Sequence, residues 1–253
     1  MVIISHLFMI EKIKTRYWDM AAVPYESLLA DMESWRQAKE KSRFVCFCDA
    51  NGLAHGWRDE ELAAAYRKSD AVMADGIIMV KLAKVYGGEL PGRVIGPVFF
   101  EKAMEYGVSR GWRHFFCGTN EETLKKLKSK LESKFPGVNI VGTFAPEYSA
   151  DPKVPEGVDC DFMWVALGSP KQEKWCARHL DEFNAAAVLP VGAAFDFHAG
   201  TQKPVPQWVH RCGVCWLWRM FTGGWRVLKR DLWCVPRAGW ILVNEYIREL
   251  VRD

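Results

Sequence analysis

Short runs of apolar residues alternate along this chain with longer amphipathic stretches. Six apolar runs read as buried strands: residues 44–47, 71–74, 114–117, 139–142, 162–167 and 187–191. Residues 59–68 and 120–135 instead read as helices, the first with acidic residues in its first turn and basic residues in its last. Strands and helices that alternate at this interval predict βαβ units. We therefore expect an α/β fold, a Rossmann-like, doubly wound and mostly parallel sheet.

The composition changes after the last predicted strand. Residues 202–240 contain one acidic residue, Asp231, whereas six of the 12 tryptophans fall there. The basic residues of this stretch are Lys203, Arg211, Arg219, Arg226, Lys229, Arg230 and Arg237. A basic, tryptophan-rich segment is typical of contact with an anionic ligand or a membrane surface. We expect an α/β domain over residues 1–206 and a helical appendage over residues 207–253.

The overall charge argues against a nucleic-acid partner. The 253 residues are 49% hydrophobic and 26% charged, and the formal net charge is only +3.

No apolar run reaches the roughly 18 to 20 residues that span a bilayer. The apolar residues 1–10 are followed by Glu11 and Lys12 without a cleavage pattern, so we expect no signal peptide. These features predict a protein that lies on a membrane if it works at one.

The cysteines do not form the pattern of a disulfide framework or a zinc site. Cys46, Cys117 and Cys160 lie in or beside apolar runs, where a reduced cysteine acts as a small hydrophobe. The pair Cys212 and Cys215 has zinc-ligand spacing but no matching second pair. We expect reduced, packed cysteines, a cytoplasmic location, and neither a metal site nor a cofactor.

Polar residues follow five of the predicted strands directly. Each strand end carries a glycine, and most carry a carboxylate or an amide; the segments are 48–52, 75–76, 118–120, 168–173 and 192–196. In a doubly wound sheet, ligands bind outside the carboxyl ends of the strands. The pattern therefore predicts one polar ligand site along that edge.

The chemistry of this edge points to an anionic ligand and a carboxylate. Gly118 and Gly168 would let backbone N–H groups approach a phosphate. The absence of a G-x-G-x-x-G fingerprint and of a P-loop weakens nicotinamide and ATP interpretations. Asp75 is the strongest candidate for a general base, and the alternative is that it caps the helix starting at residue 77. Asp49 and Asp196 carry the same two interpretations.

Several motifs, in order and spacing, resemble the WecG/TagA/CpsF glycosyltransferases. They are ADGIIMV at 74–80, RVIGPVFFEKA at 93–103, GSPKQEKW at 168–175, VGAAFDFHAGTQKPVPQW at 191–208, and a tryptophan–arginine pattern from Trp216 through Arg219 to Arg226. The resemblance covers about residues 44–230. It implies an inverting, metal-independent enzyme at the cytoplasmic face of the bacterial membrane. Such an enzyme moves N-acetylmannosamine, its uronic acid or a hexose from a UDP donor to a polyprenyl-diphosphate-linked saccharide, in cell-envelope polysaccharide or teichoic acid synthesis.

The resemblance also assigns residues. It implies that Asp75 is the base and that Arg219 and Arg226 embrace the diphosphate. Gln172 is the candidate for a direct sugar contact, and Glu173 is either a donor contact or a cap of the following helix. The remaining residues that we expect to bind substrate are Asp49, Asn51, Arg93, Gly118, Thr119, Gly168, Lys171, Asp196 and Arg230.

The chain departs from the family pattern at identifiable positions. Asp49 stands where the family usually has threonine, and Gly224 where it usually has proline. Residues 204–206 and 213–216 also differ from the usual motifs. Two other functions therefore remain alternatives: a non-catalytic protein that binds UDP-sugars, and a peripheral membrane scaffold. The sequence leaves open whether the chain forms a homo-oligomer.

Overall fold

All six predicted strands form, and they pair into one sheet. The computed structural model describes residues 10–38, 42–203, 206, 209, 217–218, 222 and 224–252, with only the backbone of Arg226. The sheet is parallel throughout and has the order β4-β3-β8-β7-β5-β6. The strands are β3 (Arg43–Cys48), β4 (Ala71–Ala74), β5 (Arg113–Gly118), β6 (Asn139–Phe144), β7 (Phe162–Ala166) and β8 (Ala187–Pro190).

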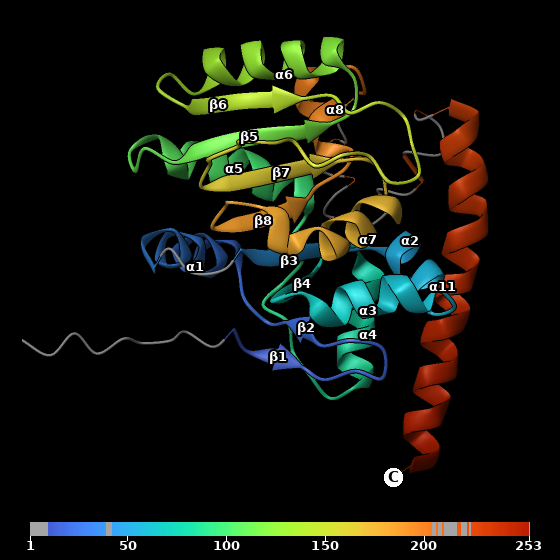
Figure 1. Cartoon of the computed structure of the whole chain (residues 1–253). Coiled ribbons are helices and arrows are strands. Elements are labelled where there is room, and N and C mark those ends of the chain that lie inside the picture. The colour runs from blue at the N-terminus through green and yellow to red at the C-terminus, as the bar shows by residue number, and fades with distance from the viewer. Residues whose placement is uncertain are drawn as a thin grey trace, which may run out of the picture.

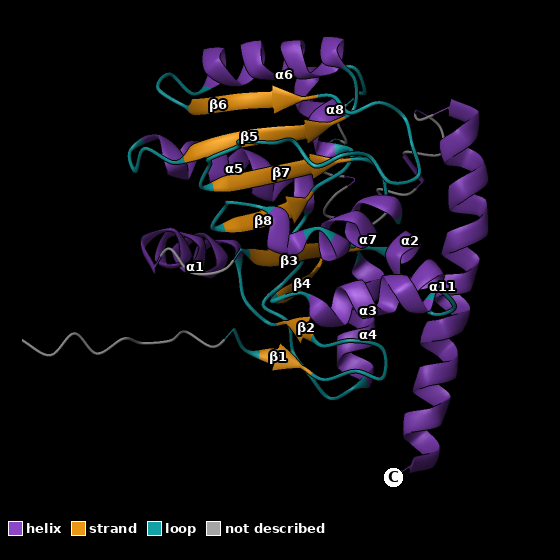
Figure 2. Ribbon diagram, viewed as in Figure 1, coloured by secondary structure: helices purple, strands orange, loops and turns teal. Residues whose placement is uncertain are grey.

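Helices cover both faces of this sheet (Figures 1 and 2). Helices α1 (Tyr25–Ala38), α5 (Gly96–Val108), α6 (Glu121–Lys134) and α8 (Ala194–Ala199) pack into one core. A second core contains α2 (Ala50–Gly56), α3 (Glu60–Lys68), α4 (Ile77–Val85), α7 (Lys171–Arg178) and the 3₁₀ turn η1 (Leu180–Glu182). A small antiparallel pair, β1 (Lys12–Ile13) and β2 (Met20–Ala21), precedes the sheet.

The alternation of side chains along a strand explains the two cores. In β3, Phe44 and Cys46 contribute to the core with α3 and α7, whereas Val45 and Phe47 contribute to the core with α1 and α5. Successive side chains of a strand point to opposite faces, so an uninterrupted apolar run suits a sheet covered on both sides. The predicted α/β, doubly wound fold is confirmed.

The two predicted helices begin and end close to the expected residues. Asp59 is the N-cap of α3, and its carboxylate accepts a hydrogen bond from the backbone N–H of Leu62. Asn120 is the N-cap of α6, where its side-chain oxygen accepts from Thr123 N–H at 2.9 Å. These side chains satisfy N–H groups that a helix start leaves without partners, which is why the sequence marks these positions well.

The C-terminal helix α11 (Gly224–Arg252) stands beside the carboxyl end of the sheet (Figure 1). It packs on α2 and α4, where Ala238 and Ile241 enter the second core. Glu245 is buried in this contact, and its carboxylate accepts hydrogen bonds from the hydroxyls of Tyr17 at 2.8 Å and Tyr86 at 2.7 Å. The expected helical appendage is confirmed, whereas its boundary at residue 206 stays a prediction.

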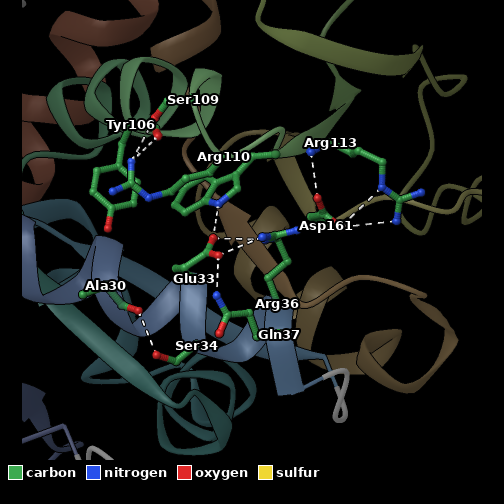
Figure 3. Close-up of polar contacts among 11 residues, drawn as sticks. Ala30, Glu33, Ser34, Arg36, Gln37, Tyr106, Ser109, Arg110, Arg113 and Asp161 are labelled. Carbon is green, nitrogen blue, oxygen red and sulfur yellow. Dashed lines mark hydrogen bonds and ion pairs between the residues drawn. The ribbon is translucent and has the colours of Figure 1, made fainter.

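A polar network joins α1 to the opposite, amino end of the sheet (Figure 3). Glu33 of α1 accepts from the indole N–H of Trp112 at 2.5 Å and pairs with Arg36. Beside it, Arg113 at the start of β5 pairs with Asp161 at 3.2 Å. The Arg36 hydrogen bond is the main reason why the pKa of Glu33 falls to about 2. This network lies at the end of the sheet away from the predicted ligand site.

The cysteines of the described residues are free and buried, as expected; they are Cys46, Cys48, Cys117, Cys160, Cys176 and Cys234. Cys212 and Cys215 lie outside the described residues. Within the described part of the chain, no helix is both long and apolar enough to cross a membrane.

Candidate functional site

The carboxyl ends of β3 and β4 bring Asp49 and Asp75 side by side. The backbone N–H of Asp75 donates to the carbonyl of Cys48 at 3.0 Å. A side chain at Gly76 would approach the Cα of Asp49 to 3.3 Å, so the two strand ends pass closely. Two carboxylates that the sequence separates by 26 positions therefore share one part of the predicted ligand edge.

Asp49 has a structural role at this edge. It is the N-cap of α2, and its Oδ1 accepts hydrogen bonds from the backbone N–H groups of Asn51 at 2.9 Å and Gly52 at 3.1 Å. This is the capping alternative that the sequence left open. Threonine, the usual family residue here, is also an N-cap residue, so the departure at Asp49 preserves the local structure.

Asp75 lies in a different setting. The N-cap position of α4 is occupied by Gly76, and the carboxylate of Asp75 instead accepts from the backbone N–H of Gly96 at 3.3 Å. The side chain of Asp75 is half-buried, so part of it remains open to solvent. A carboxylate held by a backbone N–H and still accessible has the setting that a general base requires.

The segment before α5 forms the other side of this position. The backbone N–H of Val94 donates to the carbonyl of Ala74 at 3.0 Å, which holds Arg93 next to the end of β4. Tyr25 accepts from the backbone N–H of Ile95 at 2.8 Å, and both Asp75 and Arg93 affect its pKa electrostatically. Sequence reasoning missed Tyr25, because it belongs to the first helix and no motif marks it.

The glycine at the end of β5 has a packing reason. Gly118 has φ of +126°, and a side chain there would meet the backbone carbonyl of Ala166 at 2.4 Å. The next residue, Thr119, donates its backbone N–H to the same carbonyl at 2.9 Å. The close packing of the ends of β5 and β7 therefore explains the glycine at position 118 without a bound phosphate.

The glycine after β7 is different. Gly168 has φ of +83°, is exposed, and has no atom within 4 Å of the position that a side chain would occupy. A ligand could therefore approach its backbone. Gln172 folds back to this turn, where its Oε1 accepts from Gly168 N–H at 3.2 Å.

Gln172 and Glu173 are more buried than a surface contact requires. Their exposed fractions are 4% and 1%. The amide nitrogen of Gln172 donates to Oε1 of Glu173 at 3.1 Å. Pro170 is the N-cap of α7 and Glu173 lies in the first turn, so its role as a cap of this helix stays a prediction. Asn51, also 4% exposed, donates to Oγ of Ser169 at 3.5 Å and so reaches the same turn.

Three predicted binding residues make contacts with other parts of the protein. Lys171 donates to the carbonyl of Ser149. Asp196 accepts from the hydroxyl of Thr201 at 3.0 Å, which closes the end of α8. Arg230 pairs with the neighbouring Asp231 at 2.7 Å. These contacts give each side chain a structural function.

The predicted diphosphate arginines cannot be placed. Arg219 lies outside the described residues, and so does the side chain of Arg226. The described edge therefore offers a base candidate, an accessible glycine turn and buried amides. No group of three or more histidine, cysteine or acidic residues that could hold a metal occurs within the ranges that the structure describes.

Comparison with known proteins identifies the family to which a chain with this strand edge belongs. The chain matches the Glycosyl transferase WecG/TagA/CpsF family over residues 15–252. It is 27% identical over 192 residues to the N-acetylglucosaminyldiphosphoundecaprenol N-acetyl-β-D-mannosaminyltransferase of Bacillus subtilis, covering 74% of both chains. The enzyme of the same name from Bacillus spizizenii is 24% identical, with 78% of this chain and 77% of that protein covered.

A more distant relative carries the same name. The Staphylococcus aureus protein is 22% identical over 162 residues, which cover 63% of each chain. The family match begins between β1 and β2 and reaches the last residue of α11, so it includes all six strands of the large sheet and their carboxyl ends. This chain is a glycosyltransferase that belongs to the WecG/TagA/CpsF family.

Proposed function

We propose that the protein transfers N-acetylmannosamine from a UDP donor to a polyprenyl-diphosphate-linked N-acetylglucosamine. The relatives named above carry this acceptor and this sugar in their names. The observation that supports the proposal most directly is the setting of Asp75, half-buried at the end of β4 and held by the N–H of Gly96. The product would enter cell-envelope polysaccharide or teichoic acid synthesis.

The proposed reaction is a direct displacement with inversion. A hydroxyl of the acceptor saccharide attacks the anomeric carbon, UDP leaves with the electrons of the broken bond, and Asp75 takes the hydroxyl proton. The leaving diphosphate needs positive charge at that moment. We assign this role to Arg219 and Arg226 rather than to a metal ion, because arginine binds phosphate oxygens bidentately and stays charged.

A lipid-linked acceptor requires the enzyme to reach the membrane surface. The outward face of α11 supports this part of the proposal, since it exposes Trp225, Leu232, Trp240, Val243, Ile247, Leu250 and Val251 by 53% to 82%. Most of these residues are separated by three, four, seven or eight positions, which places them on one face of a helix about 43 Å long. Lys229 and Arg237 lie on the same helix. An apolar stripe with basic residues is typical of a helix that lies in the membrane interface.

The test is a transfer assay with the purified full-length protein. We expect UDP release and a disaccharide product when UDP-N-acetylmannosamine and a polyprenyl-diphosphate N-acetylglucosamine analogue are both present, with full activity in excess EDTA. A panel of other UDP-sugars in the same assay tests the choice of donor. Loss of activity in EDTA, restored by a divalent metal, would contradict metal independence. Donor binding without transfer would favour the non-catalytic alternative, and vesicle binding without donor affinity would favour the scaffold.

A further inference from the structure

The first turn of α7 contains a carboxyl group that is almost completely buried. Glu173 is 1% exposed, and its Oε1 accepts a hydrogen bond from Nε2 of Gln172 at 3.1 Å. Its other oxygen, Oε2, is buried and has no hydrogen-bond partner among the described residues. A buried carboxylate normally has a cation or several donors around it, because its ionised form loses the stabilisation of water.

Among the described residues, the groups that act on Glu173 do not include a compensating cation. Lys174, the next residue on the helix, pairs with Asp59 and Glu61 instead. Burial therefore raises the pKa of Glu173 to about 7, and the hydrogen bonds from the backbone, Gln172 and Ser169 lower it by less. The titratable groups coupled to Glu173 from β3, α2, α3 and α7 are neutral thiols and a phenol, apart from one carboxylate; they are Cys46, Cys48, Cys176, Tyr66 and Asp49.

A second buried atom of the same cluster lacks a partner. Asn51 reaches Ser169 with its amide nitrogen, while its Oδ1 is buried and receives no hydrogen bond from the part of the chain that the structure describes. Ser169 links Asn51 to Glu173, so an ionised Glu173 would add a charged acceptor without a partner to this cluster. A protonated Glu173 would instead supply a hydrogen-bond donor to a cluster that has too few.

The cluster holds Gln172 at the junction of two strand ends. Its Oε1 accepts from Gly168 N–H after β7, and a side chain at Gly192 after β8 would lie 3.3 Å from both terminal atoms of the amide. The amide is thus tightly confined. With its proton on Oε2, Glu173 keeps Oε1 as an acceptor. Together with the N–H of Gly168, this oxygen selects the orientation in which the nitrogen of Gln172 faces inward and its oxygen faces the Gly168 turn.

We propose that Glu173 is a positioning residue, a buried neutral acid that fixes the orientation of the Gln172 amide beneath the donor site. It does not contact the donor itself. When it ionises, it adds an uncompensated negative charge beneath the site where a diphosphate binds, and donor binding weakens. The inference rests on the proposed function for this last step only.

The first test needs no substrate. The folded-state pKa of Glu173 lies above its unfolded value of about 4.5. Its protonation therefore stabilises the fold fully below that value, and the contribution is lost as pH rises through about 7. As the pH rises from 6 to 8.5, we expect the urea concentration at the unfolding midpoint of the wild type to decrease relative to that of Glu173→Gln. The variant cannot ionise at this position. Glu249→Gln, a change at a more exposed acid on α11, should follow the wild type.

The second test uses the transfer reaction. We expect the donor KM of the wild type to be on the order of tenfold higher at pH 8.5 than at pH 6, the effect of about one pKa unit of coupling. In Glu173→Gln this ratio should be close to one. Glu173→Ala, which removes the acceptor for Gln172, should raise the donor KM at every pH, with a smaller effect on kcat.

The outcomes separate the inference from the proposed function. If Glu173→Gln has the same dependence of the urea midpoint on pH as the wild type, Glu173 is not a neutral acid and the inference is wrong, whatever the enzyme transfers. If Glu173→Gln keeps the wild-type rise of KM with pH, its ionisation does not affect the donor, which overturns the second step. If neither protein transfers sugar, the proposed function fails and the midpoint still decides the protonation state.

Discussion

Asp49 and Asp75 follow adjacent strands, yet their carboxylates are used differently. Asp49 accepts two backbone N–H groups at the start of α2, whereas Asp75 accepts from Gly96, a residue 21 positions further along the chain. The first interaction is local and belongs to the helix. The second depends on how α5 packs against the end of β4, which leaves the Asp75 carboxylate partly open to solvent.

At Asp75 we predict a loss of turnover without a loss of binding. Asp75→Asn keeps the shape of the side chain and removes its ability to take a proton. The transfer rate should fall on the order of 10²- to 10⁴-fold, the usual contribution of a general base. Donor affinity, measured by calorimetry, should stay within a few fold of the wild type. Near-normal turnover of this variant would show that Asp75 is not the base.

At Asp49 we predict an effect on stability that depends on the capping oxygen. Asp49→Ala removes the acceptor for Asn51 and Gly52 and should lower the free energy of unfolding by about 1 kcal/mol. Asp49→Thr, which introduces the usual family residue, should lower the free energy of unfolding by only a few tenths of a kcal/mol. Urea denaturation of both variants checks the prediction, and equal losses would argue against a capping role.

At the scale of elements, α11 combines two faces with different partners. Its inward face buries Ala238, Ile241 and Glu245 against α2, α4 and the tyrosines Tyr17 and Tyr86. Aromatic rings also pack across this contact: the ring centroids of His55 in α2 and Trp233 in α11 are 4.6 Å apart. Because α2 begins directly after Asp49 and α4 begins two residues after Asp75, α11 is attached to the elements next to the candidate site.

The outward face of α11 should drive binding to membranes. Trp240→Ser combined with Ile247→Ser removes two large apolar side chains that are 53% exposed. We expect partition to vesicles containing anionic lipid to fall at least on the order of tenfold, because each buried large side chain contributes about 1.5 to 3 kcal/mol. Sedimentation with vesicles measures the change, and the melting temperature should stay close to that of the wild type.

A matched control separates this surface from apolar exposure in general. Val141 on β6 is 43% exposed and lies on the far edge of the sheet from α11. Val141→Ser should leave vesicle partition unchanged. Equal partition of the wild type and the α11 double variant would remove the membrane role from this face.

At the scale of the whole molecule, the interior contains groups that make the fold sensitive to acid. His114 in β5 is completely buried, and its Nδ1 accepts from the indole N–H of Trp164 at 3.1 Å. Burial lowers its pKa to about 3, so it is neutral in the folded protein. Glu33, in the network of Figure 3, has its pKa lowered to about 2.

These two groups predict stability loss in two successive pH ranges. Both folded-state pKa values lie below the unfolded ones, near 6.5 for His114 and 4.5 for Glu33. The stability from His114 is complete above pH 6.5 and is lost as pH falls toward 3, with a slope of up to about 1.4 kcal/mol per pH unit. Glu33 adds its loss only below about pH 4.5.

Urea denaturation of a substituted protein checks the first range. His114→Gln should be less stable than the wild type at pH 7, because the site is tightly packed, but its unfolding free energy should change less between pH 6.5 and 5. An unchanged slope in this variant would assign the acid sensitivity to other groups.

The sequence alone determined the elements and the chemistry along their ends. Apolar runs and caps such as Asp59 and Asn120 act within a few residues, so the six strands, α3 and α6 could be predicted from local spacing. The motifs likewise indicated the family. The glycine and carboxylate positions at the strand ends followed from the general geometry of parallel sheets.

Only the tertiary structure decided what those polar groups do. The burial of Glu173, the confinement of Gln172 by Gly192 and the hydrogen bond from Gly96 to Asp75 all join residues from different elements. The same holds for the two faces of α11. The burial and the hydrogen-bond partners of these residues depend on segments far away in the chain, which the local spacing of apolar and polar residues does not place.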